Sequence, residues 1–253
     1  ERVWREWHKG LAETSPQQFI QTLYETDTLR VQMPELDSRF LQHDNMLDVS
    51  SAIGRRTLSA LSYAADRQLP VLTRWAIVVH SLDTLTQPKN VLTKMVRGTA
   101  THDTNTNTLH QTSQSFKEQT NLINIVCDRL KTPNEFRSLA LHAGKYSGLA
   151  IHAMQARPDT LINLLDACDA WRKPEQFEHL LQCCEALIST CPEQSHRNLG
   201  SIALLRTAHK QCQNIRAKAY IDQGISGPAI GESIRSARKI QIAGLKQQFK
   251  TGN

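Results

Sequence analysis

Apolar residues recur every three or four positions along most of this chain, which is the spacing of helices that bury one face. The stretch TLSALSYAADRQLPVLTRWAIVVHSL predicts two packed helices interrupted at Pro70. Residues 122–153 predict two more, joined at Thr132-Pro133-Asn134, and residues 158–190 another two, joined at Lys173-Pro174. No segment alternates as a half-buried strand would, so the pattern predicts an all-α protein.

Start signals fit this pattern at both ends of the chain. Ser15 and Pro16 suit the cap and first turn of one helix, and Gly227-Pro228 opens the last one. Between residues 202 and 221 the pattern predicts a single further helix. On the last helix the apolar positions are expected to face a core and the basic ones to project outward, namely Arg235, Arg238, Lys239, Lys246 and Lys250.

Residues 97–115, RGTATHDTNTNTLHQTSQS, break the pattern because they offer almost nothing to bury. We expect a long mobile loop here. It contains His102-Asp103, but a metal-binding pair needs rigid support from surrounding residues, so we interpret this pair as incidental.

Composition describes an ordinary soluble chain of 253 residues, with 40% hydrophobic and 21% charged residues. No apolar run approaches the roughly 18 residues of a membrane span, so no membrane partner is expected. The net charge of +6 is concentrated in residues 199–253, which hold nine Lys and Arg against two Asp and Glu. Such asymmetry favours contact with nucleic acid, although a basic helix face is also commonly just solvated.

The six cysteines form no CxxC pair, and adjacent Cys183 and Cys184 suit a disulfide poorly. His179 and Cys183 share a helix face without a second ligand pair, so a zinc site is not expected. Buried free thiols in a reducing cytoplasm are the simpler interpretation.

Three stretches together resemble a known family: ERVWREWHKGL with SPQQFIQTLYETDTLRVQMPELD at the start, LLDACDAWRKPEQFE, and GISGPAIGESIRSAR near the end. The combination resembles the C-terminal portion of bacterial HD-type CCA-adding enzymes, or multifunctional CCA proteins. These class II tRNA nucleotidyltransferases build or repair the 3′ CCA end of tRNA. The resemblance covers almost the whole chain.

The resemblance implies a division of labour in a longer parent protein. A nucleotidyl-transfer head with a DxD pair would hold Mg²⁺, a neck would select CTP or ATP, and a helical body and tail would hold the acceptor stem and T arm of tRNA. ERVW lies downstream of the family's head and neck, and the chain lacks an initiator Met. We therefore expect a part of the parent that is inactive on its own, binds no cofactor, and resides in the cytoplasm.

The same resemblance locates an HD phosphohydrolase site that is degenerate here. The family's HD pair is His80 followed by Ser81, with Asp83 and Thr84 in place of its Gly and Lys. The other expected histidines are replaced by Arg56 and Ser147, and their cluster keeps at most His110. One imidazole cannot hold a divalent metal, so we expect a structural His80 and no metal site.

The expected RNA contacts are the basic residues of the tail and of the DAWRKP motif: Arg235, Arg238, Lys239, Lys246, Arg172 and Lys173. For Arg172 and Lys173 the alternative is a helix end, where cations suit the C-terminal dipole. Two other functions stay open, a free-standing HD-like metal phosphohydrolase and a non-catalytic helical interaction module that would pair as a homodimer. The expected layout is a helical opening of the body at 1–40, a degenerate HD-like domain at 41–195, and a basic tail at 196–253.

Overall fold

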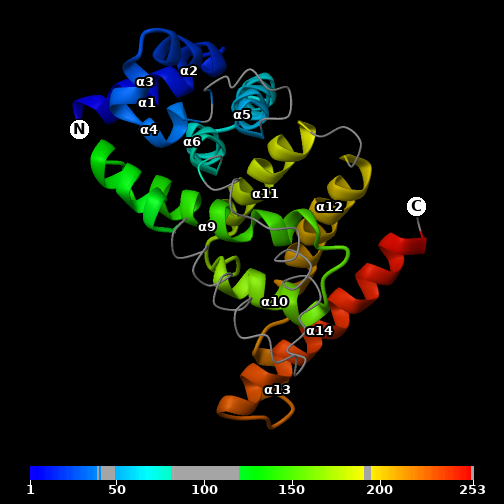
Figure 1. Cartoon of the computed structure of the whole chain (residues 1–253). Coiled ribbons are helices and arrows are strands. Elements are labelled where there is room, and N and C mark those ends of the chain that lie inside the picture. Colours follow the sequence, from blue (N-terminus) through cyan, green and yellow to red (C-terminus); the bar gives the residue numbers. More distant parts are fainter. Residues whose placement is uncertain (39, 41–48, 81, 83–119, 191–194, 252–253) are drawn as a thin grey trace, which may run out of the picture.

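All regular structure in the part of the chain that the computed structural model describes is helical (Figure 1), which confirms the all-α prediction. The described residues are 1–38, 40, 49–80, 82, 120–190 and 195–251. The expected loop at 97–115, with His102-Asp103 and His110, lies outside them, as do Ser81, Asp83 and Thr84. Among the helices in these ranges, none combines the length and apolar character that a membrane crossing requires.

Proline sets the start of several helices, as the sequence predicts. Pro16, Pro158, Pro174 and Pro228 each stand at the beginning of a helix, where the missing N–H costs no hydrogen bond. Residues 120–130 are also helical. In chain order the labelled helices are α1 Arg2–Ala12, α2 Pro16–Glu25, α3 Thr28–Gln32, α4 Pro34–Asp37, α5 Val49–Asp66, α6 Val71–His80, α9 Asn134–Ile151, α10 Pro158–Ala167, α11 Pro174–Ser189, α12 Ser195–Cys212, α13 Lys218–Ile221 and α14 Pro228–Thr251.

An aromatic cluster joins α1 to α6. Trp4 and Trp7 lie three positions apart on α1 and are both buried. Their rings meet the ring of Trp75 edge to face, with centroids 5.1 and 6.0 Å away, and Phe136 of α9 lies 4.9 Å from Trp4. Edge-to-face packing of this kind adds to the stabilisation from burying the ring area. The first helix is thereby fixed to the centre of the molecule.

A buried arginine adds a polar link between the same helices. Arg74 donates through Nη1 to the carbonyls of Leu11 and Glu13, both at 2.8 Å, and through Nε to the carbonyl of Leu69 at 2.9 Å. These carbonyls belong to the end of α1 and to the turn before α6, where intrahelical partners are missing. The guanidinium therefore satisfies the ends of two helices at once.

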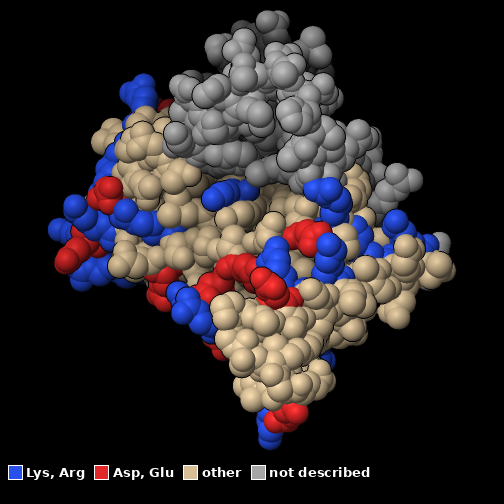
Figure 2. All heavy atoms as spheres, turned by 90° about the horizontal axis from the view of Figure 1, so that it is seen from below, with Lys and Arg blue, Asp and Glu red and all other residues tan. Residues whose placement is uncertain are grey.

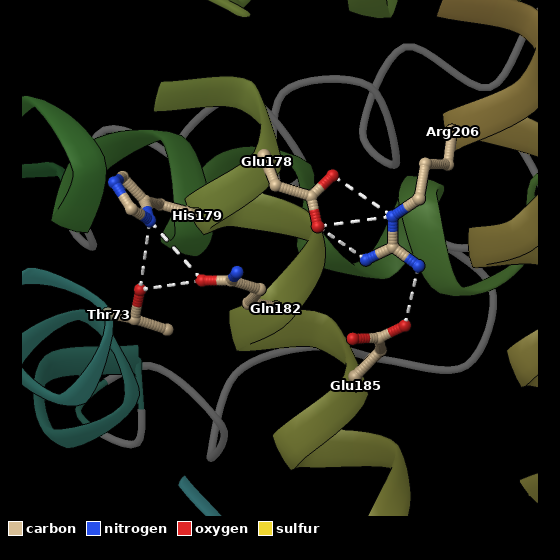
Figure 3. A network of polar contacts seen from close by, with 6 residues as sticks. All are labelled: Thr73, Glu178, His179, Gln182, Glu185 and Arg206. Atoms are coloured by element: carbon tan, nitrogen blue, oxygen red, sulfur yellow. Dashed lines mark hydrogen bonds and ion pairs between the residues drawn. The ribbon is translucent and has the colours of Figure 1, made fainter. Parts of the chain in front are cut away.

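Helix α11 lies in the middle and contacts α5, α6, α9 and α12. Figure 3 shows polar side chains leaving it in two directions. Toward α6, His179 Nδ1 lies 3.5 Å from Thr73 Oγ1. Toward α12, Arg206 donates to Glu178 at 2.6 Å and to Glu185 at 2.9 Å. These bonds tie the basic C-terminal segment to the central helices.

The predicted helix over residues 202–221 is wrong in its bounds. Helix α12 begins at Ser195 and ends at Cys212, and α13 is a separate helix. The bonds from the Asn214 and Ile215 amides reach back only three residues, which closes a tight turn instead of continuing α12. The buried Cys212 thiol lies against the Arg238 carbonyl of α14 at this point. Contact with α14 thus coincides with the end of α12.

The buried residues form one connected cluster that extends from α1 to α14. The domain boundaries at 40–41 and 195–196 stay a prediction.

The five cysteines within the described ranges are free and buried, as expected, and burial raises the pKa of Cys183 to about 12. Such thiols are protonated at neutral pH and act as small apolar groups.

Candidate nucleic-acid interface

Helix α14 carries most of the candidate cations and has a small buried face. It is 24 residues long, yet only Ile242 and Leu245 are buried. Gly227 immediately before it has a φ of +61°, a conformation that glycine adopts at no steric cost. In Figure 1 the helix runs along one side of the molecule, and it contacts α10, α12 and α13. A broad apolar surface therefore does not hold this helix against its neighbours, and polar contacts must contribute.

Two of the candidates form ion pairs with α10. Arg235 Nη1 lies 3.0 Å from Asp166 Oδ2, and its Nη2 donates to Asn163 Oδ1 at 2.6 Å. Lys239 Nζ lies 2.7 Å from Asp159 Oδ2. Both cations remain about half exposed, at 44% and 52% of the side chain. They project to solvent as predicted, and each already has an acidic partner.

Arg238 and Lys246 do not project outward, so that part of the prediction is wrong. The Arg238 guanidinium stacks on the ring of Trp171, 3.7 Å from its centroid. Lys246 Nζ donates to the carbonyl of Ala156. Burial lowers the pKa of both side chains. The long side chains of these two cations and the indole of Trp171 pack where α14 meets the rest of the molecule. Helical periodicity alone does not reveal that a charged residue packs in this way.

Arg172 and Lys173 lie in the turn between α10 and α11. Helix α10 ends at Ala167, so the alternative that these cations end a helix is also wrong. Lys173 is instead the N-cap of α11. Arg172 is strongly exposed and pairs with Asp169 at 2.7 Å. For Lys173 the described residues provide no ion-pair partner.

These two cations border a cavity of about 800 Å³. The first turns of α9 and α11 contribute Glu135 and Glu175 to its lining, and His179 closes one side. The two glutamates match the two cations in number, so the cavity has no net excess of positive charge. The cavity is therefore a charge-balanced hollow beside the candidate cations.

Two of the four degenerate HD positions come together. His80 at the end of α6 and Ser147 of α9 share a hydrogen bond of 2.9 Å between Nε2 and Oγ. Arg56 is exposed on α5, and Ser81 lies outside the described residues. Within the described ranges, no three His, Cys, Asp or Glu side chains are grouped as a metal site requires. The imidazole of His80 thus bonds a hydroxyl, and the degenerate HD domain stays a prediction.

Burial lowers the pKa of His80 to about 4. The unfolded chain takes up a proton near pH 6.5, whereas the folded imidazole stays neutral to about pH 4, so the stability that neutral His80 contributes is complete above pH 6.5 and is lost as pH falls toward 4. We expect the free energy of unfolding to drop by about 2 kcal/mol between pH 7 and 5 through this group. Urea unfolding at both pH values should show that His80→Gln removes this drop and that His8→Gln, at an exposed position, keeps it. An unchanged drop in His80→Gln would contradict the assignment.

The residues that sequence reasoning missed are the acidic partners and the unpaired cations. Asp159, Asn163 and Asp166 recur at helical spacing on α10, a signal that is visible in the sequence but does not say which helix they meet. Lys210, Arg216 and Lys218 are exposed, and within the described residues no ion pair involves them. Figure 2 shows the consequence on one face, where Lys and Arg side chains are interleaved with Asp and Glu.

Comparison with known proteins finds several multifunctional CCA proteins. The chain is 30% identical to the multifunctional CCA protein of Thioalkalivibrio sulfidiphilus over 250 residues, 98% of this chain and 57% of that protein. It is 29% identical to the multifunctional CCA protein of Legionella pneumophila strain Paris over 259 residues, covering 99% and 57%. For that of Pseudomonas fluorescens Pf-5 the identity is 30% over 253 residues, covering 98% and 57%.

No family model and no solved structure matches the chain. The chain spans somewhat more than half the length of the relatives it matches. The three resembling stretches and this coverage both indicate that the matched part is the C-terminal portion. Over almost its whole length, the chain is related to the C-terminal portion of multifunctional CCA proteins.

Proposed function

We propose that this chain binds tRNA as the body and tail of a CCA-adding tRNA nucleotidyltransferase. The observation that carries the proposal is the relation to multifunctional CCA proteins over 98% of the chain. Charge supports it, because residues 199–253 carry nine Lys and Arg and only two Asp and Glu. Phosphate contacts from such a surface supply most of the affinity of a protein for RNA backbone. The acceptor stem and T arm are the parts of tRNA that the resemblance implies.

The six candidate residues would contribute in different ways. Arg235, Lys239 and Arg172 are exposed and ion-paired, so each exchanges a carboxylate for a phosphate when RNA binds. Lys173 is exposed and needs no exchange. Arg238 and Lys246 are partly buried and hold α14 in place, so their effect on RNA is mainly through the position of that helix.

The chemistry of the parent protein belongs to the same proposal. The resemblance assigns Mg²⁺, CTP and ATP to a nucleotidyl-transfer head and neck. We propose that this chain is inactive alone. We also propose that the HD-like region has lost metal-dependent hydrolysis, since His80 bonds Ser147. The alternative of a metal phosphohydrolase would need ligands from outside the described residues. A cytoplasmic location follows from the same role.

The test is the affinity of the chain for tRNA as a function of salt, measured by fluorescence anisotropy. With about four phosphate contacts, raising KCl from 50 to 200 mM should weaken binding about 100-fold. Light scattering on the same samples checks for a homodimer. Absence of binding to tRNA at 50 mM KCl would overturn the proposal, and a tight dimer without response to tRNA would instead support a helical interaction module.

A further inference from the structure

A row of acidic and amide side chains on α10 faces the row of cations on α14. Asp159, Asn163 and Asp166 are spaced by four and three positions, so they lie along one face of α10. Arg235 and Lys239, four positions apart on α14, bond to all three at 2.6 to 3.0 Å. The two rows therefore match one another over more than one helical turn. Phosphate oxygens accept charge-assisted hydrogen bonds of the same kind as these carboxylates.

The contacts between the rows are of a kind that an external anion can replace. The four charged side chains of the two ion pairs are 44 to 52% exposed. Ion pairs at this exposure contribute little net stability, because water screens their attraction and both side chains lose freedom. The helix itself keeps other anchors when they open, since Ile242 and Leu245 stay buried and Arg238 stays on Trp171.

We propose that Asp159 and Asp166 act as intramolecular competitors of the RNA backbone for Arg235 and Lys239. When RNA is absent the α10 carboxylates occupy these cations, and phosphates displace them on binding. The two aspartates thereby lower the affinity of the chain for RNA and reduce its dependence on salt, because each displaced carboxylate recovers counterions that the phosphate releases. This inference rests on the proposed binding of tRNA.

Asparagine is the right replacement because it removes charge and keeps an acceptor oxygen. Asp166 Oδ1 also accepts a hydrogen bond of 2.6 Å from the indole of Trp171, and an amide oxygen can take its place. The charge-matched control is Asp222→Asn with Glu232→Gln. Both control residues are exposed in the same basic segment, and neither takes part in an ion pair within the described residues.

The experiment compares three proteins in a tRNA titration at 50, 100 and 200 mM KCl: wild type, Asp159→Asn/Asp166→Asn, and the control pair. We expect the α10 variant to bind about 3- to 30-fold more tightly than wild type at 100 mM KCl. Its plot of log affinity against log salt should be steeper by about one to two. The control pair should show a smaller change in both quantities, because it frees no cation.

The outcomes of the titration distinguish a failure of the competition from a failure of the proposed function. Equal gains in the α10 variant and the control pair would overturn the competition and leave only a net-charge effect. An α10 variant that binds no better than wild type would overturn it as well, provided that circular dichroism shows unchanged helicity. If none of the three proteins binds tRNA at 50 mM KCl, the proposed function itself fails. The single variants Asp159→Asn and Asp166→Asn separate the two positions, and each should give about half of the free-energy gain.

Discussion

Replacement of Trp75 by alanine is expected to lower the free energy of unfolding by about 3–5 kcal/mol. The indole is fully buried and lies edge to face with Trp4 and Trp7 of α1. Its loss leaves a cavity at the only aromatic junction that the described residues form between α1 and α6. Neither flanking tryptophan can collapse into the space, because each is fixed by α1 and by a further ring, Phe136 or Phe19.

Urea unfolding followed by circular dichroism measures this loss. Trp75→Phe should recover part of it, since a smaller ring still fills much of the site. Trp171→Ala is matched in residue type at a partly exposed position and should cost clearly less, because water replaces part of the lost contact. A loss below about 1 kcal/mol in Trp75→Ala would contradict the role of this junction in fixing α1 to α6.

The triple replacement of Lys173, Arg235 and Lys239 by alanine is expected to weaken tRNA binding about 30- to 100-fold at 100 mM KCl. These three candidates are exposed, and none of them anchors a helix through a buried contact. Loss of Lys173 should reduce the salt slope by about one. Loss of Arg235 and Lys239 should reduce it by less, because their displaced carboxylates recover counterions, so the slope should fall by about one to two in total. The measurement is the same anisotropy titration that tests the wild type.

The matched control replaces Arg2, Lys9 and Arg30, which lie on α1 and α3 and are exposed. It removes the same charge from the opposite end of the chain. Equal losses in the two triple variants would mean that tRNA responds to net charge, and would contradict an interface at the tail and the α10–α11 turn. Unfolding curves of both variants check that neither loss reflects an altered fold.

Helix starts were predictable because proline acts locally. Pro16, Pro174 and Pro228 fix their own φ and lack an N–H, so each favours a first turn whatever surrounds it. The end of α12 at Cys212 was not predictable in the same way. Helical spacing continues past it, and the break coincides with contact to α14. The HD positions came from the resemblance. Two of them, His80 and Ser147, share a hydrogen bond, and the degenerate HD domain stays a prediction.

The sequence by itself determined that the chain is helical, where several helices begin, and that positive charge gathers after residue 199, since periodicity, proline and charge are properties of the chain. Only the tertiary structure decided which cations have a partner within the chain and which do not. Arg235 and Lys239 meet Asp159 and Asp166 across about seventy to eighty residues of chain, and Arg238 finds Trp171. A side chain is paired or exposed according to the neighbour that packing brings to it, and no local pattern encodes that neighbour.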